Sequence, residues 1–231
     1  MKSYSTLDEC ILGGLNAPCF SKLLPEEIEL VKDSKVQVQF RKGENITKQG
    51  AFASSVLFVV DGIVRQYIIG DTNRDFNLRI IRSGDFIGLS AAFSKHTYDY
   101  STIALKDTLV CLIEKQAMAG LIKRNGNFAY GLINRYYEND SSLYDTIRSM
   151  MYKQMHGRLA DVLLYLNTMN YNDERIFSYL SRKEIADFAG LSTESTVKLL
   201  KGFEKDGLIS LIDKDIDILD ASALIEISKR G

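Results

Sequence analysis

Cysteine is scarce in this chain of 231 residues, occurring only at Cys10, Cys19 and Cys111. So few cysteines, and an odd number of them, cannot build the disulfide framework of a small secreted protein. A low cysteine content is typical of proteins in a reducing compartment. We therefore expect a cytoplasmic protein.

Long apolar runs are also missing, and their absence excludes a membrane-spanning segment. The run Val56–Val60 stops at Asp61, well short of the roughly 18 residues that a span needs. Met1–Ser3 is not followed by the hydrophobic region of a signal peptide. We expect no association with a membrane.

Positive charge is not in excess, because 29 Lys and Arg stand against 30 Asp and Glu, a net charge of −1. From His156 onward the balance is 10 basic against 13 acidic residues, a net charge of −3. Composition therefore gives no sign of nucleic-acid binding. A nucleic-acid-binding surface would require that charges of opposite sign be segregated.

The sequence also lacks the motifs of common catalytic sites. The sequence has no Gly-rich phosphate loop, no His–Glu spacing for a metal and no nucleophile elbow. We expect that the protein is not an enzyme and that it carries no cofactor.

The strongest pattern present is a helix–turn–helix between Ser181 and Leu211. Ser181–Glu184 fits a capping box that starts one helix. Gly190 ends that helix, and Ser192 is the N-cap of a second helix that ends before Gly207. Small polar residues crowd the start of the second helix, where a recognition helix meets base edges in the major groove. Taken alone, the segment also fits an ordinary helical hairpin with solvated ends.

The residues after Gly207 favour DNA binding over a plain helical hairpin. Leu208–Ile212 is an apolar run, Asp213–Asp215 is a turn, and Ile216–Leu219 alternates apolar and polar residues. This pattern predicts a β-hairpin, the wing of a winged helix–turn–helix. The charges can then be segregated, with basic residues on the DNA side (Arg182, Lys183, Lys198 and Lys201) and acidic residues on the wing (Asp213, Asp215, Asp217 and Asp220).

The N-terminal half has a β-rich texture from Lys35 to about Cys111, preceded by a short helix over Pro25–Val31. Short apolar or alternating runs are separated by Gly-containing turns at intervals typical of a closed antiparallel barrel or jelly roll. The runs are residues 36–40, 46–50, 56–60, 63–69 and 76–81. The fold class is therefore α+β: a β-barrel or jelly roll, a long helix and a winged helix–turn–helix.

A long helical pattern joins the two halves, from Phe128 to roughly Asn167, with a bend expected at Gly157. Its apolar residues recur at helical spacing and form one stripe: Leu132, Tyr136, Leu143, Ile147, Met150 and Met151. Such a helix buries its stripe best against a twin, which predicts a homodimer. Packing along its own barrel is the alternative.

Together these features resemble the CRP/FNR family of bacterial transcription regulators. The resemblance covers nearly the whole chain after Phe20, and its sharpest motifs are Arg41–Glu44 with Gly50, Asp61-Gly62, Gly84–Gly88 and Ser181–Ile209. It implies a homodimer that binds a near-palindromic site in double-stranded DNA, an effector signal that passes through the dimer helices, and RNA polymerase as a partner. The expected domains are an effector-type β-roll (1–125), a dimerisation helix (126–155) and a DNA-binding domain (156–231).

The resemblance also places DNA contacts on this chain. Glu194 and Lys198 match the family positions that carry glutamate and arginine and that read bases. Ser181, Arg182 and Lys183 start the first helix, where phosphates are bound. The remaining expected contacts are Ser192, Thr193, Ser195, Thr196 and Lys201.

The family's cyclic-nucleotide contacts do not carry over. Gly88 is followed by Leu89 rather than glutamate, and Tyr100-Ser101 replaces the Arg-Ser pair that holds the cyclic phosphate. Leu143-Tyr144 replaces the Thr-Ser pair that meets the adenine. An unpaired buried phosphodiester is costly, so we expect a more apolar region for an effector other than cyclic AMP, or no ligand. The candidate residues are Phe86, Ile87, Gly88, Leu89, Tyr100, Ser101, Leu143 and Tyr144.

Three cysteines cannot complete the four-cysteine iron–sulfur set of the oxygen-sensing relatives, so we expect no metal. Cys111 reads as a core residue, while a redox role for Cys10 or Cys19 stays open. His96 reads as a surface residue and His156 as a hinge residue. The alternative function is a β-roll that senses a small molecule or redox state and acts through protein contacts, with a degenerate DNA-binding domain.

Overall fold

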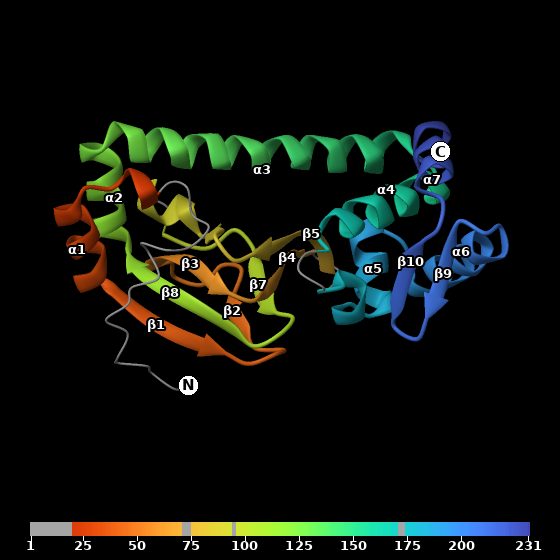
Figure 1. The fold of residues 1–231 in the computed structure, drawn as a ribbon, viewed down its shortest axis with the longest axis horizontal. Coiled ribbons are helices and arrows are strands. Elements are labelled where there is room, and N and C mark those ends of the chain that lie inside the picture. Colours follow the sequence, from red (N-terminus) through yellow and green to blue (C-terminus); the bar gives the residue numbers. More distant parts are fainter. Residues whose placement is uncertain (1–19, 71–74, 94–95, 171–173) are drawn as a thin grey trace. The chain divides into compact units, whose positions relative to one another are not determined.

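The computed structural model describes residues 20–70, 75–93, 96–170 and 174–231 (Figure 1). Within them one compact unit extends to Asp140 and a second runs from Ser141 to Gly231, with residues 75–78 grouped with the second. The predicted domain boundaries at residues 125 and 155 remain a prediction. Cys10 and Cys19 lie outside the described residues.

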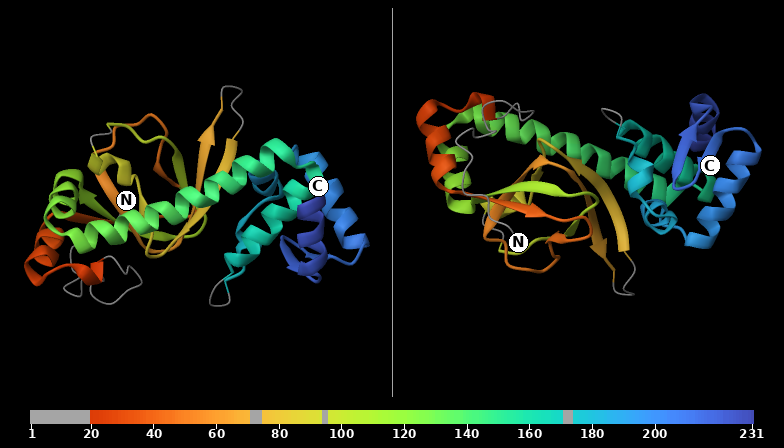
Figure 2. Two further views of the ribbon diagram at one scale, coloured as in Figure 1. Left: turned by 90° about the horizontal axis from the view of Figure 1, so that it is seen from above. Right: turned by 60° about the horizontal axis from the view of Figure 1, so that its bottom comes forward.

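Two four-stranded sheets build the first unit (Figure 2). One sheet has the strand order β1 (Lys35–Phe40), β8 (Thr108–Glu114), β3 (Ser55–Asp61) and β6 (Phe86–Ile87). The other has the order β2 (Asn45–Thr47), β7 (Ser101–Ala104), β4 (Ile63–Ile69) and β5 (Asp75–Arg82). The pairs β1–β8, β3–β8, β3–β6, β2–β7 and β4–β7 are antiparallel. The expected jelly-roll architecture is confirmed.

Apolar side chains of both sheets form one hydrophobic core. Val56–Val60 of β3 is buried throughout, as its unbroken apolar run suggests. Phe20, in the 3-10 helix η2 (Phe20–Lys22), lies against Phe58 and Phe86 at ring-centroid distances of 5.1 and 5.5 Å. Burial of such aromatic groups contributes strongly to stability.

Gly62 has a backbone conformation that other residues rarely adopt, with φ at +130°. A Cβ at this position would lie 2.3 Å from Thr108 Oγ1. Both the left-handed φ and the close approach require glycine, which explains the Asp61-Gly62 motif.

Helices flank the β-roll and continue into the second unit. They are α1 (Pro25–Asp33), the 3-10 helix η3 (Leu89–Phe93), α2 (Lys115–Arg124) and α3 (Gly126–Tyr152), followed by α4 (Met155–Thr168). The long helical pattern is therefore interrupted at Lys153–Gln154, and the bend expected at Gly157 was wrong. Gly157 is needed for another reason: a Cβ on it would lie 2.9 Å from the backbone of Gly231.

The second unit packs helices around the predicted wing. After α4 it contains the 3-10 helix η4 (Ile176–Tyr179), α5 (Arg182–Ala189), α6 (Thr193–Lys205), β9 (Ile209–Ile212), β10 (Asp215–Ile218) and α7 (Ala221–Arg230). Strands β9 and β10 pair antiparallel from Ile212–Asp215 to Ile209–Ile218, so the hairpin is confirmed. The core includes the fully buried Leu159, Leu163, Leu166, Phe177, Ile185 and Leu224.

Candidate nucleic-acid interface

The first helix of the helix–turn–helix starts with a complete capping box. Ser181 Oγ accepts from the Glu184 amide at 3.2 Å, and Glu184 Oε2 accepts from the Ser181 amide at 2.7 Å. Two otherwise unpaired backbone donors are thereby satisfied, a device that contributes about 1 kcal/mol to a helix. The start of α5 is fixed as the sequence predicted.

The turn between the helices depends on Gly190 and Leu191. Gly190 ends α5 in the left-handed conformation, with φ at 60°, and Leu191 is buried. Ser192 then caps α6 by accepting from the Ser195 amide at 3.1 Å, and it donates to Ser195 Oγ at 2.8 Å. These contacts set the start of the second helix and use the Ser192 hydroxyl both as donor and as acceptor, while Ser195 Oγ only accepts.

Helix α6 has a buried face and an exposed one. Thr196, Leu200 and Phe203 are buried. The exposed residues that could face DNA are Thr193, Glu194, Lys198 and Lys201. Glu194 and Lys198, four residues apart, lie on the same side of the helix, so the structure brings the two predicted base-reading side chains together.

Thr196 corrects the predicted set of DNA contacts. Its side chain is fully buried, and within the described residues its hydroxyl has no hydrogen-bond partner. The reason is its position four residues before Leu200, on the stripe of α6 that packs inward. Thr196 is a core residue and does not contact DNA through its side chain.

Arg182 is half-buried and contacts the wing. Its Nη2 donates to the carbonyl of Asp213 in the wing turn at 3.3 Å. Burial lowers the pKa of Arg182, while Asp215 and Glu204 raise it. Arg182 therefore helps to position the wing turn, and its contact with a DNA phosphate stays a prediction.

Lys183 is exposed at the start of α5, but it also has a partner. Its Nζ lies 2.8 Å from Asp187 Oδ2, one turn further along the helix. The carboxylate is only 5% exposed whereas the lysine is 63% exposed. Lys183 therefore compensates a buried negative charge while keeping most of its side chain in solvent.

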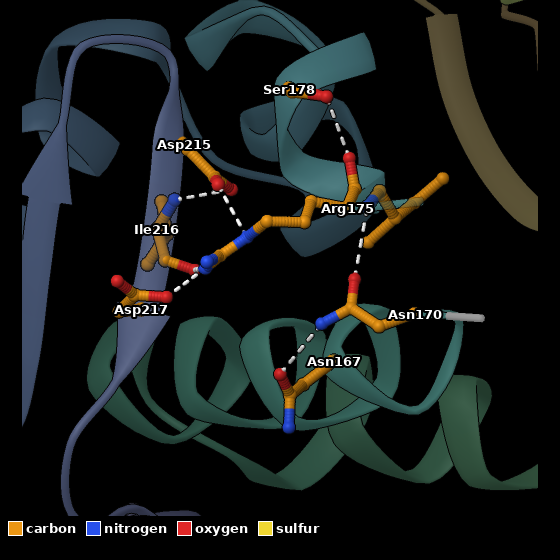
Figure 3. A network of polar contacts seen from close by, with 8 residues as sticks. Asn167, Asn170, Arg175, Ser178, Asp215, Ile216 and Asp217 are labelled. Carbon is orange, nitrogen blue, oxygen red and sulfur yellow. Dashed lines mark hydrogen bonds and ion pairs between the residues drawn. The ribbon is translucent and has the colours of Figure 1, made fainter. Parts of the chain in front are cut away.

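The acidic wing has a cationic partner that the sequence reasoning missed. Figure 3 shows Arg175 reaching across to β10, where Nε lies 2.5 Å from Asp215 Oδ2 and Nη2 pairs with Asp217. The backbone is held there because Ser178 Oγ donates to the Arg175 carbonyl at 2.7 Å, and Asn170 Oδ1 accepts from the Ile176 amide at 2.9 Å. Arg175 thus pairs with two of the wing's carboxylates and offsets one of their two negative charges. The alternating acidic residues Asp215 and Asp217 were the only feature of the sequence that pointed to a cationic partner for the wing.

The predicted effector residues divide into core and candidate contacts. Phe86 and Ile87 are buried in the hydrophobic core, where their side chains stabilise the β-roll; their role in an effector site stays a prediction. Gly88 donates its amide hydrogen to Tyr100 Oη at 2.9 Å. Burial raises the pKa of Tyr100, the hydrogen bond from Gly88 and the nearby Arg79 lower it, and Asp99 and Tyr136 raise it. The net shift is upward, so the phenol keeps its proton at neutral pH.

The other effector candidates remain predictions. Leu89 is half-buried against the core, and Ser101 is buried with Oγ accepting from the Gln49 amide at 3.0 Å. Leu143 and Tyr144 are exposed on α3. Cys111 is buried, as predicted for a core residue.

Two negative findings apply to the described part of the chain. It contains no group of three or more His, Cys, Asp or Glu side chains arranged to hold a metal ion. None of its helices combines the length and the apolar composition needed to cross a membrane.

A β-roll joined to a winged helix–turn–helix defines a DNA-binding regulator with an effector-type domain. Comparison with known families agrees: the cyclic nucleotide-binding domain matches residues 37–125, and the Crp-like helix-turn-helix domain matches residues 157–227. The chain belongs to the CRP/FNR family of bacterial transcription regulators.

Individual relatives are distant but extend over most of the chain. The transcriptional activator protein anr of Pseudomonas aeruginosa is 26% identical over 203 residues, which cover 85% of this chain and 80% of that protein. The cyclic AMP receptor protein of Thermus thermophilus is 24% identical over 216 residues, covering 92% and 97%. The structure of FixK2 from Bradyrhizobium japonicum shares the fold with a TM-score of 0.74 at 22% identity, covering 84% of this chain and 96% of that one. Members of the CRP/FNR family are regulators of transcription and not enzymes.

The burial of Thr196 leads to a first prediction. In Thr196→Val the unpaired hydroxyl becomes a methyl group of similar size, so the free energy of unfolding should rise by about 1 kcal/mol. DNA affinity should be unchanged. Urea unfolding and fluorescence anisotropy with labelled DNA measure the two quantities. Thr193→Val, at an exposed position, should give no gain in stability, and a loss of DNA binding in Thr196→Val would contradict the reassignment.

Proposed function

We propose that this regulator acts as a homodimer that binds a near-palindromic DNA site through the exposed first turns of α6, under the control of an effector other than cyclic AMP. The observation that carries the DNA-binding part is the exposed pair Glu194 and Lys198 on a helix whose start is fixed by Ser192. RNA polymerase is the expected protein partner.

Base recognition would come from two complementary groups on α6. The Glu194 carboxylate can accept a hydrogen bond from the amino group of cytosine or adenine, and the Lys198 ammonium can donate to guanine. A lysine lacks the two-pronged geometry of arginine. Guanine preference should therefore be softer than in relatives with arginine at this position.

Phosphate contacts would surround this pair. The start of α5 presents the Ser181 region and the exposed Lys183, and helix starts attract phosphates through backbone amides and the helix dipole. Lys201 is exposed on α6, while Thr193 stands exposed at its start. The pairing of Arg175 with Asp215 and Asp217 reduces the repulsion between the wing and the DNA backbone.

Dimerisation is supported by an exposed apolar stripe along α3. It differs from the stripe predicted from the sequence, because Leu132 is buried in the chain's own hydrophobic core. Large apolar side chains are exposed at spacings of three and four residues, which places them on one side of a helix. They include Ile133, Tyr137, Tyr144, Ile147 and Met151. A second copy of α3 would cover this stripe. In this proposal residues 1–125 sense the effector, residues 126–155 form the dimer contact and residues 156–231 bind DNA.

The effector is proposed to differ from cyclic AMP because Tyr100 stands where the nucleotide-binding relatives carry the arginine that holds the cyclic phosphate. Its hydroxyl already accepts the Gly88 amide hydrogen, a backbone donor that would otherwise be available to a bound anion. Leu89 adds an apolar side chain where the nucleotide-binding relatives carry glutamate. Leu143 and Tyr144, exposed on α3, remain candidates for completing the effector region in a dimer.

Base reading is tested by selecting DNA from a random pool with purified full-length protein. Glu194→Ala should relax the preference at one base pair per half-site and weaken binding to the wild-type site by about 1–3 kcal/mol. Glu226→Ala removes an exposed carboxylate from α7 of the same unit and should leave the selected motif unchanged. An identical motif for wild type and Glu194→Ala would refute the assignment of Glu194.

Dimerisation is tested with two variants that introduce the same charge within the apolar stripe of α3 and beside it. Ile147→Glu places a carboxylate within the apolar stripe, and burying it unpaired against a second copy is costly. We expect a monomer at micromolar concentration in sedimentation velocity. Asn134→Glu lies beside the stripe at an exposed position and should remain a dimer. Equal association of the two variants would contradict α3 as the dimer contact.

A further inference from the structure

A groove runs along one side of α6 and is bounded by that helix, by α7 and by the start of α4. Its volume is about 710 Å³, which is in the range of pockets that hold small molecules. Every residue that lines it belongs to the second unit of the chain. The proposed base-reading face of α6 adjoins this groove, because Lys198 is among the residues that line it.

Gly202 lines the groove at a position where the chain itself gives no reason for a glycine. It lies inside α6, three residues before the helix ends at Lys205, and a glycine inside a helix lowers stability relative to alanine. A Cβ on Gly202 would meet no atom within 4 Å, whereas a Cβ on Gly157 would lie 2.9 Å from the backbone of Gly231. The space above Gly202 is therefore open, and the missing side chain keeps the groove deep.

The walls of the groove are mostly apolar. Leu199 and Phe203 come from α6, Ile227 comes from α7 and Met155 from α4. Phe203 is buried, Leu199 and Ile227 are half-buried, and Met155 is 46% exposed. Covering such side chains with an apolar group is favourable because it removes apolar surface from water. A molecule that fits the groove therefore has an apolar body.

The charged side chains of the groove favour an anion near Lys198. On α7, Glu226 is held by Lys229 at 3.0 Å, and Arg230 adds a second cation 3.9 Å from it. Among the described residues, neither the Lys198 ammonium nor the Asp206 carboxylate has a hydrogen-bond or ion-pair partner. Asp206 follows Lys198 by eight residues, roughly 12 Å along the axis of α6. An anionic group is thus attracted to Lys198 and kept away from the other end of the groove.

From this arrangement we propose that the groove binds a small amphipathic carboxylate, whose apolar body covers Leu199, Phe203 and Ile227 and whose carboxylate pairs with Lys198. Lys198 is also a proposed base-reading residue, so the bound carboxylate holds the ammonium that otherwise donates to guanine. DNA and the carboxylate therefore compete for α6. The inference rests on the proposed function of α6 and adds a ligand site that belongs to the DNA-binding unit and not to the β-roll.

The test titrates full-length protein by calorimetry with 4-phenylbutyrate and with 4-phenylbutanamide, which has the same apolar body and no charge. We expect saturable binding of the carboxylate and binding about tenfold weaker for the amide. Lys198→Gln should bind the carboxylate as weakly as wild type binds the amide. Gly202→Leu fills the groove and should abolish binding. Its melting temperature should not fall, because leucine favours a helix more than glycine does.

Lys205 provides the matched control position, because it is exposed in the last turn of α6 and does not line the groove. Lys205→Leu and Lys205→Gln introduce the same two side chains outside the groove and should bind 4-phenylbutyrate as wild type does. Equal binding by Gly202→Leu and Lys205→Leu, equal binding of the carboxylate and the amide, or no saturable binding to wild type overturns the inference.

Competition is measured by fluorescence anisotropy on the DNA site that the wild-type protein selects. At ten times its Kd, 4-phenylbutyrate should lower the DNA affinity of wild type about tenfold, and the DNA affinity of Gly202→Leu should not respond to it. Unchanged DNA affinity of wild type would show that the carboxylate leaves Lys198 free, against the inference. Selection of DNA without the carboxylate tests the proposed function by itself, so the two can fail separately.

Discussion

The ion pairs of Arg175 with Asp215 and Asp217 are the interaction on which the DNA-binding unit depends. The wing follows directly after α6, and its sequence is acidic, so unpaired carboxylates there would repel a phosphate backbone. Arg175, fixed by the start of η4, pairs with two of them and offsets one of their two negative charges. Arg182 holds the wing turn through the Asp213 carbonyl. Charge segregation in this unit is achieved by ion pairs inside the domain, and α6 keeps Glu194 and Lys198 exposed.

The ends of α5 and the start of α6 could be predicted from the sequence because capping residues have one dominant structural role. Ser181 with Glu184, Gly190 and Ser192 each specify a helix end, and the structure has those ends. Strands β6, β7 and β8 and helices α2 and α7 were not among the predicted elements. Phe86–Ile87 and Ser101–Ala104 are short, and Ala221–Arg230 follows no distinctive motif except Asp220. The interruption at Lys153–Gln154 was misplaced to Gly157, because the tertiary approach of Gly231 to that glycine is invisible in sequence.

The side-chain roles were harder to predict than the helices that carry them. Thr196 looked like a surface residue because of its polarity, yet its place on the inward stripe of α6 buries it. Arg175 pairs with Asp215, which lies 40 residues later in the sequence. Arg79 donates to Gln66, which lies 13 residues earlier. Only the packing of distant strands brings these groups together.

The most direct test of the account is the DNA affinity of the wing variants on the site selected by wild-type protein. Arg175→Gln should bind about tenfold more weakly because it exposes two carboxylates to the DNA. Adding Asp215→Asn and Asp217→Asn to Arg175→Gln removes those charges and should restore most of the affinity, with melting temperatures measured for each variant. Wild-type affinity in Arg175→Gln, or no recovery when the two carboxylates are neutralised, would contradict the account.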